Sequence, residues 1–309
     1  MAMLDDLHHL HERDVHDVLG AAERQIRYLG EPTIINYPTP SSPVYNVVVA
    51  GPCSAAELLL SWLPLTEPLE ILAGYTIPGY VDGETLAVIG DAPSELRELL
   101  QKSGAQMVSC SPRGAHHGGF TILAELKTLA AILERYELVP SKSIDELEKV
   151  QPFLEEAIKA WRATTPTADN LAKQLALEMI GTSPVIYSGP LLAPAARSWK
   201  TSFNRLAHNV AWQGTYPAVR LTDVPGWRSH PIDKIYSVID LSSSLENPHI
   251  DTQMQAAERA LSGKRPAANK IAAVGQTKLQ QLLWTIVLGN FVAAYTAILN
   301  GISPCIEAI

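Results

Sequence analysis

The chain has 309 residues, of which 47% are hydrophobic and 18% charged, and its formal net charge is −8 at pH 7. This composition excludes a disordered protein, because it supplies enough apolar surface for a packed core. The net negative charge and the lack of a basic cluster predict that the chain binds neither nucleic acid nor an anionic membrane. Cys53, Cys110 and Cys305 are too scattered for a disulfide framework or a zinc site, which favours a reducing cytoplasm.

Short apolar strands alternate with helices along the first half of the chain. Residues 4–29 have the spacing of an amphipathic helix with short breaks. The predicted elements that follow are at 45–52 (strand), 55–63 (helix), 70–78 (strand), 85–90 (strand), 94–104 (helix), 105–110 (strand) and 119–138 (helix). This alternation is typical of a parallel sheet with helices on both faces.

The second half repeats this pattern after a helical connector. Residues 139–178 are predicted to be mostly helical, with breaks at Pro and Thr. The predicted elements beyond them are at 183–190 (strand), 196–209 (helix), 209–214 (strand), 234–241 (strand), 251–264 (helix) and 276–299 (helix). The stretch "SPVIYSGP" at 183–190 has the same pattern as "YNVVVAGP" at 45–52. This similarity indicates a duplicated unit.

We therefore predict an α/β fold of two doubly wound parallel-sheet domains. Residues 1–140 would form an N-terminal helical arm and the first domain, 141–178 a helical connector, and 179–309 the second domain. The uncharged stretch at 282–299 reaches the length of a membrane span, but it contains Thr, Gly, Asn and Tyr, and no basic flank follows it. We expect a buried core helix or a dimer helix there instead of a membrane span.

Ligands of doubly wound sheets bind beyond the carboxyl ends of the strands. In this chain that rule points to the loops at 51–54, 90–94, 111–118 and 188–191. The candidate ligand-binding residues in these loops are Gly51, Cys53, Ser54, Asp91, Ser94, His116, His117 and Ser188.

Four stretches together resemble one known family. They are "LDDLHHLHERDV" near the start, "YTIPGYVDGETLAVIG" at 75–90, "SPVIYSGPLLAPAARSWKTSFN" at 183–204 and "LGNFVAAYTAILNGISP" at 288–304. In this order they resemble the bifunctional phosphoglucose/phosphomannose isomerases, which consist of two SIS (sugar isomerase) domains. The resemblance implies a sugar or sugar-phosphate ligand, aldose–ketose isomerisation through an enediol, and a homodimer. We expect no cofactor and no metal.

The residues expected to do the isomerisation differ from the family pattern. A sugar isomerase needs a base that takes a proton from one carbon and returns it to the next. The family pattern places this base in an Asn-Glu-Asn sequence, where this chain has Asn204-Arg205-Leu206. A guanidinium has no acceptor and does not lose its proton, so Arg205 cannot act as that base. Leu221 stands at the position of the family's His, and Asp223 at the Glu that follows.

The loop after the third predicted strand also departs from the family. Its Ser-x-Ser-Gly-Asn-Thr phosphate signature is replaced by "GDAPSE", in which Ser94 is the one hydroxyl. We expect Asp91 to cap the N–H groups of the next turn. A phosphate dianion about 5 Å from this carboxylate would be repelled by several kcal/mol at an effective dielectric of about 20. The helix terminus attracts it by only about 0.3–2 kcal/mol, so the loop should exclude phosphate.

Several other residues have two readings. Arg113 corresponds to the family's catalytic Arg after a Pro, or it is an exposed loop residue. His116 and His117 are acid/base or donor groups, or plain loop residues. His208 lies three residues after Arg205 and either shares its helix face as a replacement base or is an ordinary helix-end His.

Two further sets of residues are expected to have no functional role. Trp199, Trp212 and Trp227 are expected in the core. His8 and His11 have helical metal-ligand spacing, but no third ligand accompanies them, so we expect a solvated helix face.

The preferred hypothesis is a SIS protein that binds a carbohydrate derivative and lacks the standard isomerase activity. One alternative is an active sugar-phosphate isomerase that uses displaced catalytic groups, namely Arg113, His116, His208 or Asp223. Another is a structural or regulatory dimer partner with an apolar interface on the helix at 282–299.

Overall fold

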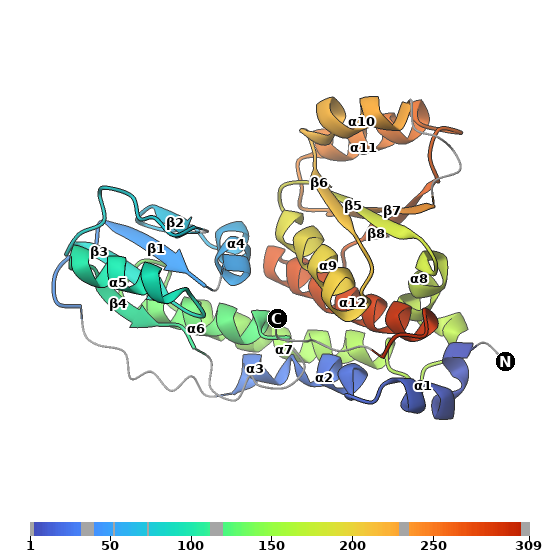
Figure 1. Cartoon of the computed structure of the whole chain (residues 1–309), viewed down its shortest axis with the longest axis horizontal. Coiled ribbons are helices and arrows are strands. Elements are labelled where there is room, and N and C mark those ends of the chain that lie inside the picture. Colours follow the sequence, from blue (N-terminus) through green and yellow to red (C-terminus); the bar gives the residue numbers. More distant parts are fainter. Residues whose placement is uncertain are drawn as a thin grey trace. The chain divides into compact units, whose positions relative to one another are not determined.

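The computed structural model describes residues 3–31, 40–51, 53–72, 74–111, 120–228 and 235–303. They form two units (Figure 1), which we call the N-terminal unit, Gln25–Gln151, and the C-terminal unit, Met1–Arg24 with Pro152–Ile309. The first helices of the chain belong to the C-terminal unit because they pack on its longest helix. The domain boundaries predicted at 140 and 178 assumed that each domain is one continuous stretch of the chain. These boundaries stay a prediction.

The N-terminal unit contains a four-stranded parallel sheet. Its strands are β1 (Asn46–Ala50), β2 (Leu69–Leu72), β3 (Thr85–Ile89) and β4 (Gln106–Ser109), in the order β2-β1-β3-β4. Its helices are α3 (Arg27–Gly30), α4 (Cys53–Trp62), α5 (Ser94–Ser103), α6 (Ile122–Arg135) and the first part of α7 (Ser143–Lys159). All four strands predicted in this half are present.

Both faces of this sheet are covered. Successive side chains of a strand point to opposite faces. Val48 and Ala50 of β1 pack in one cluster with Leu96 and Leu100 of α5. The intervening Val49 is also fully buried, on the opposite face. Burial on both sides explains why β1 is a continuous apolar run instead of an alternating one.

The C-terminal unit repeats the same sheet topology. Its strands are β5 (Ser183–Ser188), β6 (Trp212–Thr215), β7 (Tyr236–Ser242) and β8 (Ala268–Ala272), in the parallel order β6-β5-β7-β8. Figure 1 shows α10 (Val219–Arg228) and α11 (Pro248–Ala260) over one face, and α8 (Leu171–Met179), α9 (Ala193–Leu206) and α12 (Lys278–Leu299) over the other. The remaining elements are η1 (Met3–Asp5), α1 (Leu7–Arg13), α2 (Val18–Arg24) and η2 (Thr167–Asp169). The prediction of two doubly wound parallel-sheet domains with helices on both faces is confirmed.

Two elements of the C-terminal unit were not predicted. Strand β8 lies at the edge of the sheet, and only Ile271 of its five residues is buried, so it lacks the apolar run of a central strand. Helix α10 contains Pro225, a residue that normally ends a helix. In both cases the contacts with the rest of the unit outweigh the weak local pattern.

Helix α12 is the core helix of its unit. By length and composition it could cross a membrane, yet its most apolar window is entirely buried inside the structure. Its polar groups have partners: Trp199 Nε1 donates to the Thr285 carbonyl at 2.7 Å, and Ser202 Oγ donates to Asn290 Oδ1 at 2.7 Å. The predicted core helix is confirmed. The alternative hypothesis of an apolar dimer interface on this helix is wrong, because the chain's own residues cover the helix.

Candidate functional site

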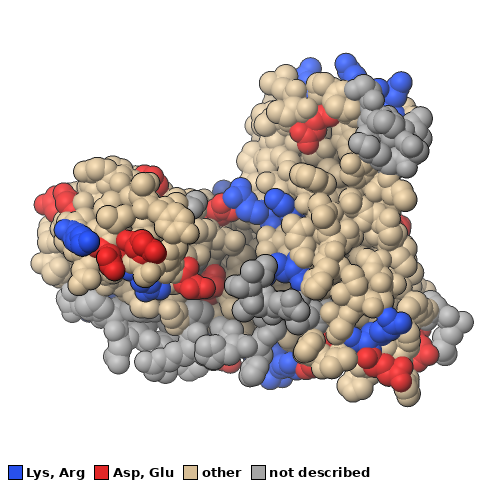
Figure 2. Space-filling view, viewed as in Figure 1, with Lys and Arg blue, Asp and Glu red and all other residues tan. Residues whose placement is uncertain are grey.

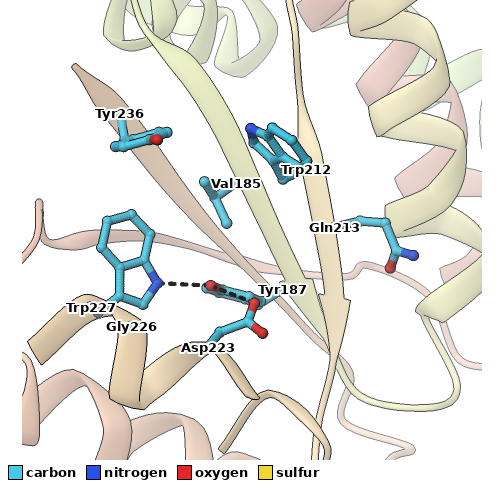
Figure 3. Close-up of a pocket in the computed structure, with 8 residues that line it drawn as sticks. All are labelled: Val185, Tyr187, Trp212, Gln213, Asp223, Gly226, Trp227 and Tyr236. Carbon is cyan, nitrogen blue, oxygen red and sulfur yellow. Dashed lines mark hydrogen bonds between the residues drawn. The ribbon is translucent and has the colours of Figure 1, made fainter. Parts of the chain in front are cut away.

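The C-terminal unit has a pocket of about 490 Å³ where α10 covers the edge of the sheet. In parallel strands, register partners point to the same face, and Val185 of β5 is the partner of Trp212 of β6. Tyr187, two residues after Val185, points to that face as well. The pocket is lined by Val185, Tyr187, Trp212, Gln213, Asp223, Gly226, Trp227 and Tyr236 (Figure 3).

A chain of hydrogen bonds holds one carboxylate in this pocket. Trp227 Nε1 donates to the Tyr187 hydroxyl at 2.8 Å, and that hydroxyl donates to Asp223 Oδ2 at 3.0 Å (Figure 3). Thr222 Oγ1 donates to Asp223 Oδ1 at 2.6 Å. Burial raises the pKa of Tyr187, and the charge of Asp223 raises it further. The phenol therefore stays protonated and keeps Asp223 in place.

The other walls of the pocket are aromatic. The rings of Trp227 and Tyr236 meet edge to face with their centroids 5.4 Å apart. Trp212 is 56% exposed, which corrects the expectation that it lies in the core. The side chain of Gln213 points to the other side of β6 (Figure 3). Among the described residues that line the pocket, Asp223 carries the one charge and none is Lys or Arg.

Of the predicted catalytic residues, the structure places Asp223 in this pocket. Its partner Tyr187 lies 36 residues before it, and Trp227, which donates to the Tyr187 hydroxyl, lies four residues after it. Trp227 is buried as expected of a core residue, and Trp199 is fully buried. Nothing in the sequence pattern connected these residues with Asp223, because strand register and helix docking bring them together. The catalytic role of Asp223 stays a prediction.

Of the two interpretations of His208, the structure excludes a helix face shared with Arg205 and agrees with a residue just beyond the helix end. Helix α9 ends at Leu206, and both Arg205 and His208 are exposed. His208 has a backbone φ of 45°, in the left-handed region, which turns the chain away from the helix. Leu221, which the resemblance places at the family's His, is 80% exposed.

In the N-terminal unit the loops after β1 and β3 lie against each other, as the carboxyl-end rule predicts. Gly51 has a φ of 106°, and a Cβ there would lie 2.7 Å from the backbone N of Asp91. Only glycine fits this close approach. Cys53 begins α4 and is half-buried, and its N–H donates to the Gly51 carbonyl at 2.8 Å. Ser54 is exposed in the first turn of α4.

The loop after β3 is not capped by Asp91 as predicted. Pro93 occupies the cap position of α5 and makes no side-chain cap hydrogen bond, and Ser94 Oγ donates to the Glu95 carboxylate at 3.1 Å. Arg97 holds this loop instead, because its Nε donates to the Ala92 carbonyl at 3.1 Å and its Nη2 to the Gly90 carbonyl. The negative charge of exposed Asp91 remains at this junction.

A second carboxyl group lies near Asp91. Burial raises the pKa of Glu125 on α6, a hydrogen bond with Thr121 lowers it, and the charge of Asp91 raises it. In the described part of this loop cluster the carboxyl groups of Asp91, Glu95 and Glu125 outnumber the Arg97 guanidinium, which disfavours a phosphate ligand.

The equivalent loop of the C-terminal unit, after β5, also holds a carboxylate. Glu246 Oε2 accepts a hydrogen bond from the backbone N–H of Leu191 at 2.7 Å. A Cβ on Gly189 would lie 2.5 Å from the same oxygen. Ser188, a predicted ligand residue, is fully buried, and its hydroxyl has no partner among the described residues. Glu246 was missed because it follows β7, 55 residues after Leu191.

A buried carboxyl group, also missed, lies at the base of a small recess. Asp240 of β7 is 2% exposed, and neither of its oxygens has a hydrogen-bond partner among the described residues. Burial raises the pKa of Asp240 to about 6, although the charge of Arg265 lowers it. The recess, of about 80 Å³, is lined by Asp240, Ser242, Asp251, Met254, Gln255 and Lys270.

The remaining candidate residues lie within 112–119 or on helix α1. Arg113, His116 and His117 lie outside the described residues, so their predicted roles stay predictions. His8 is exposed and lies 3.4 Å from the carboxylate of Glu12. Within the described ranges, no group of three or more His, Cys, Asp or Glu side chains is placed to hold a metal ion.

The expected lack of a nucleic-acid partner stays a prediction. On the face drawn in Figure 2, Lys and Arg side chains occur singly or in small groups among acidic ones, and no broad basic surface is visible among the described residues.

Comparisons with known proteins point to sugar-phosphate enzymes. Residues 168–309 match the family described as bacterial phospho-glucose isomerase C-terminal SIS domain. The chain is 23% identical over 265 residues to the bifunctional phosphoglucose/phosphomannose isomerase of Caldicellulosiruptor bescii, covering 77% of each protein. It is 21% identical over 264 residues to that of Aquifex aeolicus, covering 81% of this chain and 82% of the relative.

Solved structures agree in fold. A glucose-6-phosphate isomerase like protein from Thermus thermophilus has a TM-score of 0.69 at 20% identity, covering 98% of this chain and 95% of that one. The C-terminal domain of glucosamine-fructose-6-phosphate aminotransferase from Francisella tularensis has a TM-score of 0.62 at 14% identity, covering 99% of this chain and 100% of that one.

Proposed function

This chain belongs to the family of bifunctional phosphoglucose/phosphomannose isomerases, and on that premise we propose that it binds a carbohydrate derivative without the family's isomerase chemistry. The observation that carries the proposal is Arg205. It stands where the resemblance implies the catalytic carboxylate, and it is exposed near the end of α9. A guanidinium cannot take a proton from a sugar carbon at neutral pH.

Two further positions support the loss of isomerase chemistry. Leu221, at the position of the family's His, has an apolar side chain that can neither donate nor accept a proton. Asp91 and Glu246 add negative charge at the strand–helix junctions where a phosphate would approach a helix N-terminus. These features weaken both the proton transfer and the attraction for a phosphorylated substrate.

The direct test is an isomerase assay on the purified chain with glucose 6-phosphate, mannose 6-phosphate and fructose 6-phosphate. We expect no turnover above the uncatalysed background, with a bifunctional phosphoglucose/phosphomannose isomerase as the positive control. Turnover of any of the three substrates at ordinary enzymatic rates would overturn the proposal.

The position of Asp223 favours a second candidate, an isomerase with displaced catalytic groups. Its carboxylate is held in a pocket by Tyr187 and has the chemistry of a general base. This candidate requires a measurable activity that Asp223→Asn abolishes. If the purified chain shows no activity on the three sugar phosphates, this candidate is excluded for those substrates.

The expected homodimer remains part of the proposal. Sedimentation velocity of the purified chain would measure it, and a monomer at micromolar concentration would contradict it.

A further inference from the structure

We infer that the pocket between α10 and strand β6 is a binding site for an unphosphorylated pyranose sugar. In this site the sugar ring stacks on the aromatic walls, and its hydroxyl groups donate to Asp223. For the class of ligand, a carbohydrate derivative, the inference rests on the proposed function. It adds where this ligand binds and that it carries no phosphate group.

The pocket has the size and walls of a small-molecule site. Its volume of about 490 Å³ lies within the range of roughly 300–1,000 Å³ typical of ligand pockets. A pyranose presents flat faces of C–H groups, and these pack well on the electron-rich face of an aromatic ring. Trp212 is 56% exposed on the edge strand, so part of its indole surface is open to a ligand.

Asp223 supplies the polar contact that such a ligand needs. An ionised carboxylate can accept about four hydrogen bonds. Two of these are taken, by the Tyr187 hydroxyl at 3.0 Å and by Thr222 Oγ1 at 2.6 Å. The remaining capacity suits neighbouring sugar hydroxyls, and hydrogen bonds to an ionised acceptor are stronger than neutral ones.

The charges around the pocket exclude a phosphate group. Among the described residues that line it, the one charge is that of Asp223, which repels an anion. Arg265 lies close enough to lower the pKa of Tyr187, but its Nη2 donates to Glu258 Oε2 at 2.8 Å. Its charge is therefore already balanced. The expected ligand is a free sugar, with or without an amino group.

The test measures binding of glucose, mannose, glucosamine, glucose 6-phosphate and tetramethylammonium to the full chain by calorimetry and ligand-observed NMR. We expect at least one unphosphorylated sugar to bind, at least tenfold more tightly than glucose 6-phosphate. Trp212→Ala and Asp223→Asn should each weaken that binding about tenfold or more. Tyr75→Ala, which removes an exposed aromatic of the N-terminal unit, is the matched control and should change nothing.

Four outcomes would overturn the inference: no binding of any sugar, preference for glucose 6-phosphate, binding of tetramethylammonium without any sugar, or sugar binding unchanged in both pocket variants. Trp212 is largely exposed, so its variant is expected to fold, and the circular dichroism spectrum checks this. Isomerase activity on sugar phosphates would overturn the proposed function but not the pocket. Sugar binding that ignores Trp212 and Asp223 would overturn the pocket but not the proposed function.

Discussion

Glu246 accepts a hydrogen bond from the backbone N–H of Leu191 at 2.7 Å, just before α9 begins. At such a strand–helix junction, free N–H groups normally attract an anionic ligand. Here the protein's own carboxylate takes that place, and it lies against Gly189, where a Cβ would be 2.5 Å from its oxygen. The junction after β5 is therefore occupied by a carboxylate from the loop that follows β7.

Removing this carboxylate should loosen the loop and admit an anion. Glu246→Ala leaves the Leu191 N–H without its partner, and we expect the free energy of unfolding to fall by about 1–3 kcal/mol. Added inorganic phosphate should raise the melting temperature of this variant more than that of the wild type. Asp251→Ala, an exposed acidic residue of α11, is the control for the change in net charge. A wild-type response to phosphate as large as the variant's would contradict this account.

Asp240 should make stability depend on pH in a particular direction. Its folded-state pKa of about 6 lies above the ordinary value of 3.8, so the native state holds the proton more strongly than the unfolded state. The cost of burying its charge therefore grows as pH rises from about 4 to about 6 and is fully present above that range.

The matching variant is Asp240→Asn, which removes the buried charge. At pH 7 it should raise the free energy of unfolding by about 1–3 kcal/mol, because one pKa unit corresponds to about 1.4 kcal/mol. Near pH 4 the difference should vanish. Urea unfolding of variant and wild type between these values measures it, with Glu178→Gln, an exposed carboxylate of α8 outside the recess, as the control. A variant that is less stable than the wild type at pH 7 would show that Asp240 has a stabilising partner.

Lys127 should be essential to the N-terminal unit. Its buried ammonium donates to the carbonyls of Leu29 and Glu31, both at 2.6 Å, and to Glu148 Oε1 at 3.0 Å. Lys127→Met leaves these acceptors unpaired, and we expect a loss of about 2–4 kcal/mol. Lys149→Met, an exposed residue of α7, should change stability by less than about 0.5 kcal/mol. Thermal unfolding compares the two, and equal melting temperatures would contradict the prediction.

Gly289 should not tolerate even a methyl group. A Cβ at this position of α12 would lie 2.3 Å from the Trp199 ring, inside the core. We expect Gly289→Ala to destabilise the protein by about 1–3 kcal/mol through overpacking. Gly226 of α10 is the matched control, because a Cβ there meets no atom within 4 Å. Gly226→Ala should be neutral or stabilise by up to about 1 kcal/mol, since alanine favours the helix.

Much of the fold could be predicted because the central strands are buried on both faces. Continuous apolar runs such as β1 and β5 are recognisable without any knowledge of their neighbours. Edge strand β8 and the Pro-containing helix α10 were not recognised, because their local residues do not favour the state they adopt. For these two elements, packing against the rest of the unit decides the structure.

The candidate site was much less predictable. Asp223 was recognised through the resemblance, but the residues that hold it, Tyr187 and Trp227, come from β5 and the end of α10. The exposed face of Trp212 gave no signal, since a tryptophan in an apolar sequence is usually buried. Strand register and the docking of α10, which the sequence pattern does not specify, brought these side chains together.

The amino-acid sequence by itself determined the duplicated α/β architecture, because apolar runs are local properties, and the resemblance read from it led to the proposal that Arg205 replaces the family's base. Tertiary structure alone decided that Arg97 holds the loop beside Asp91, that Glu246 closes the junction after β5, and that Asp223 lies in an aromatic pocket. Each of these depends on side chains whose position relative to a loop or to each other is set by helix packing or strand register. That is a property of the folded chain and not of any local stretch.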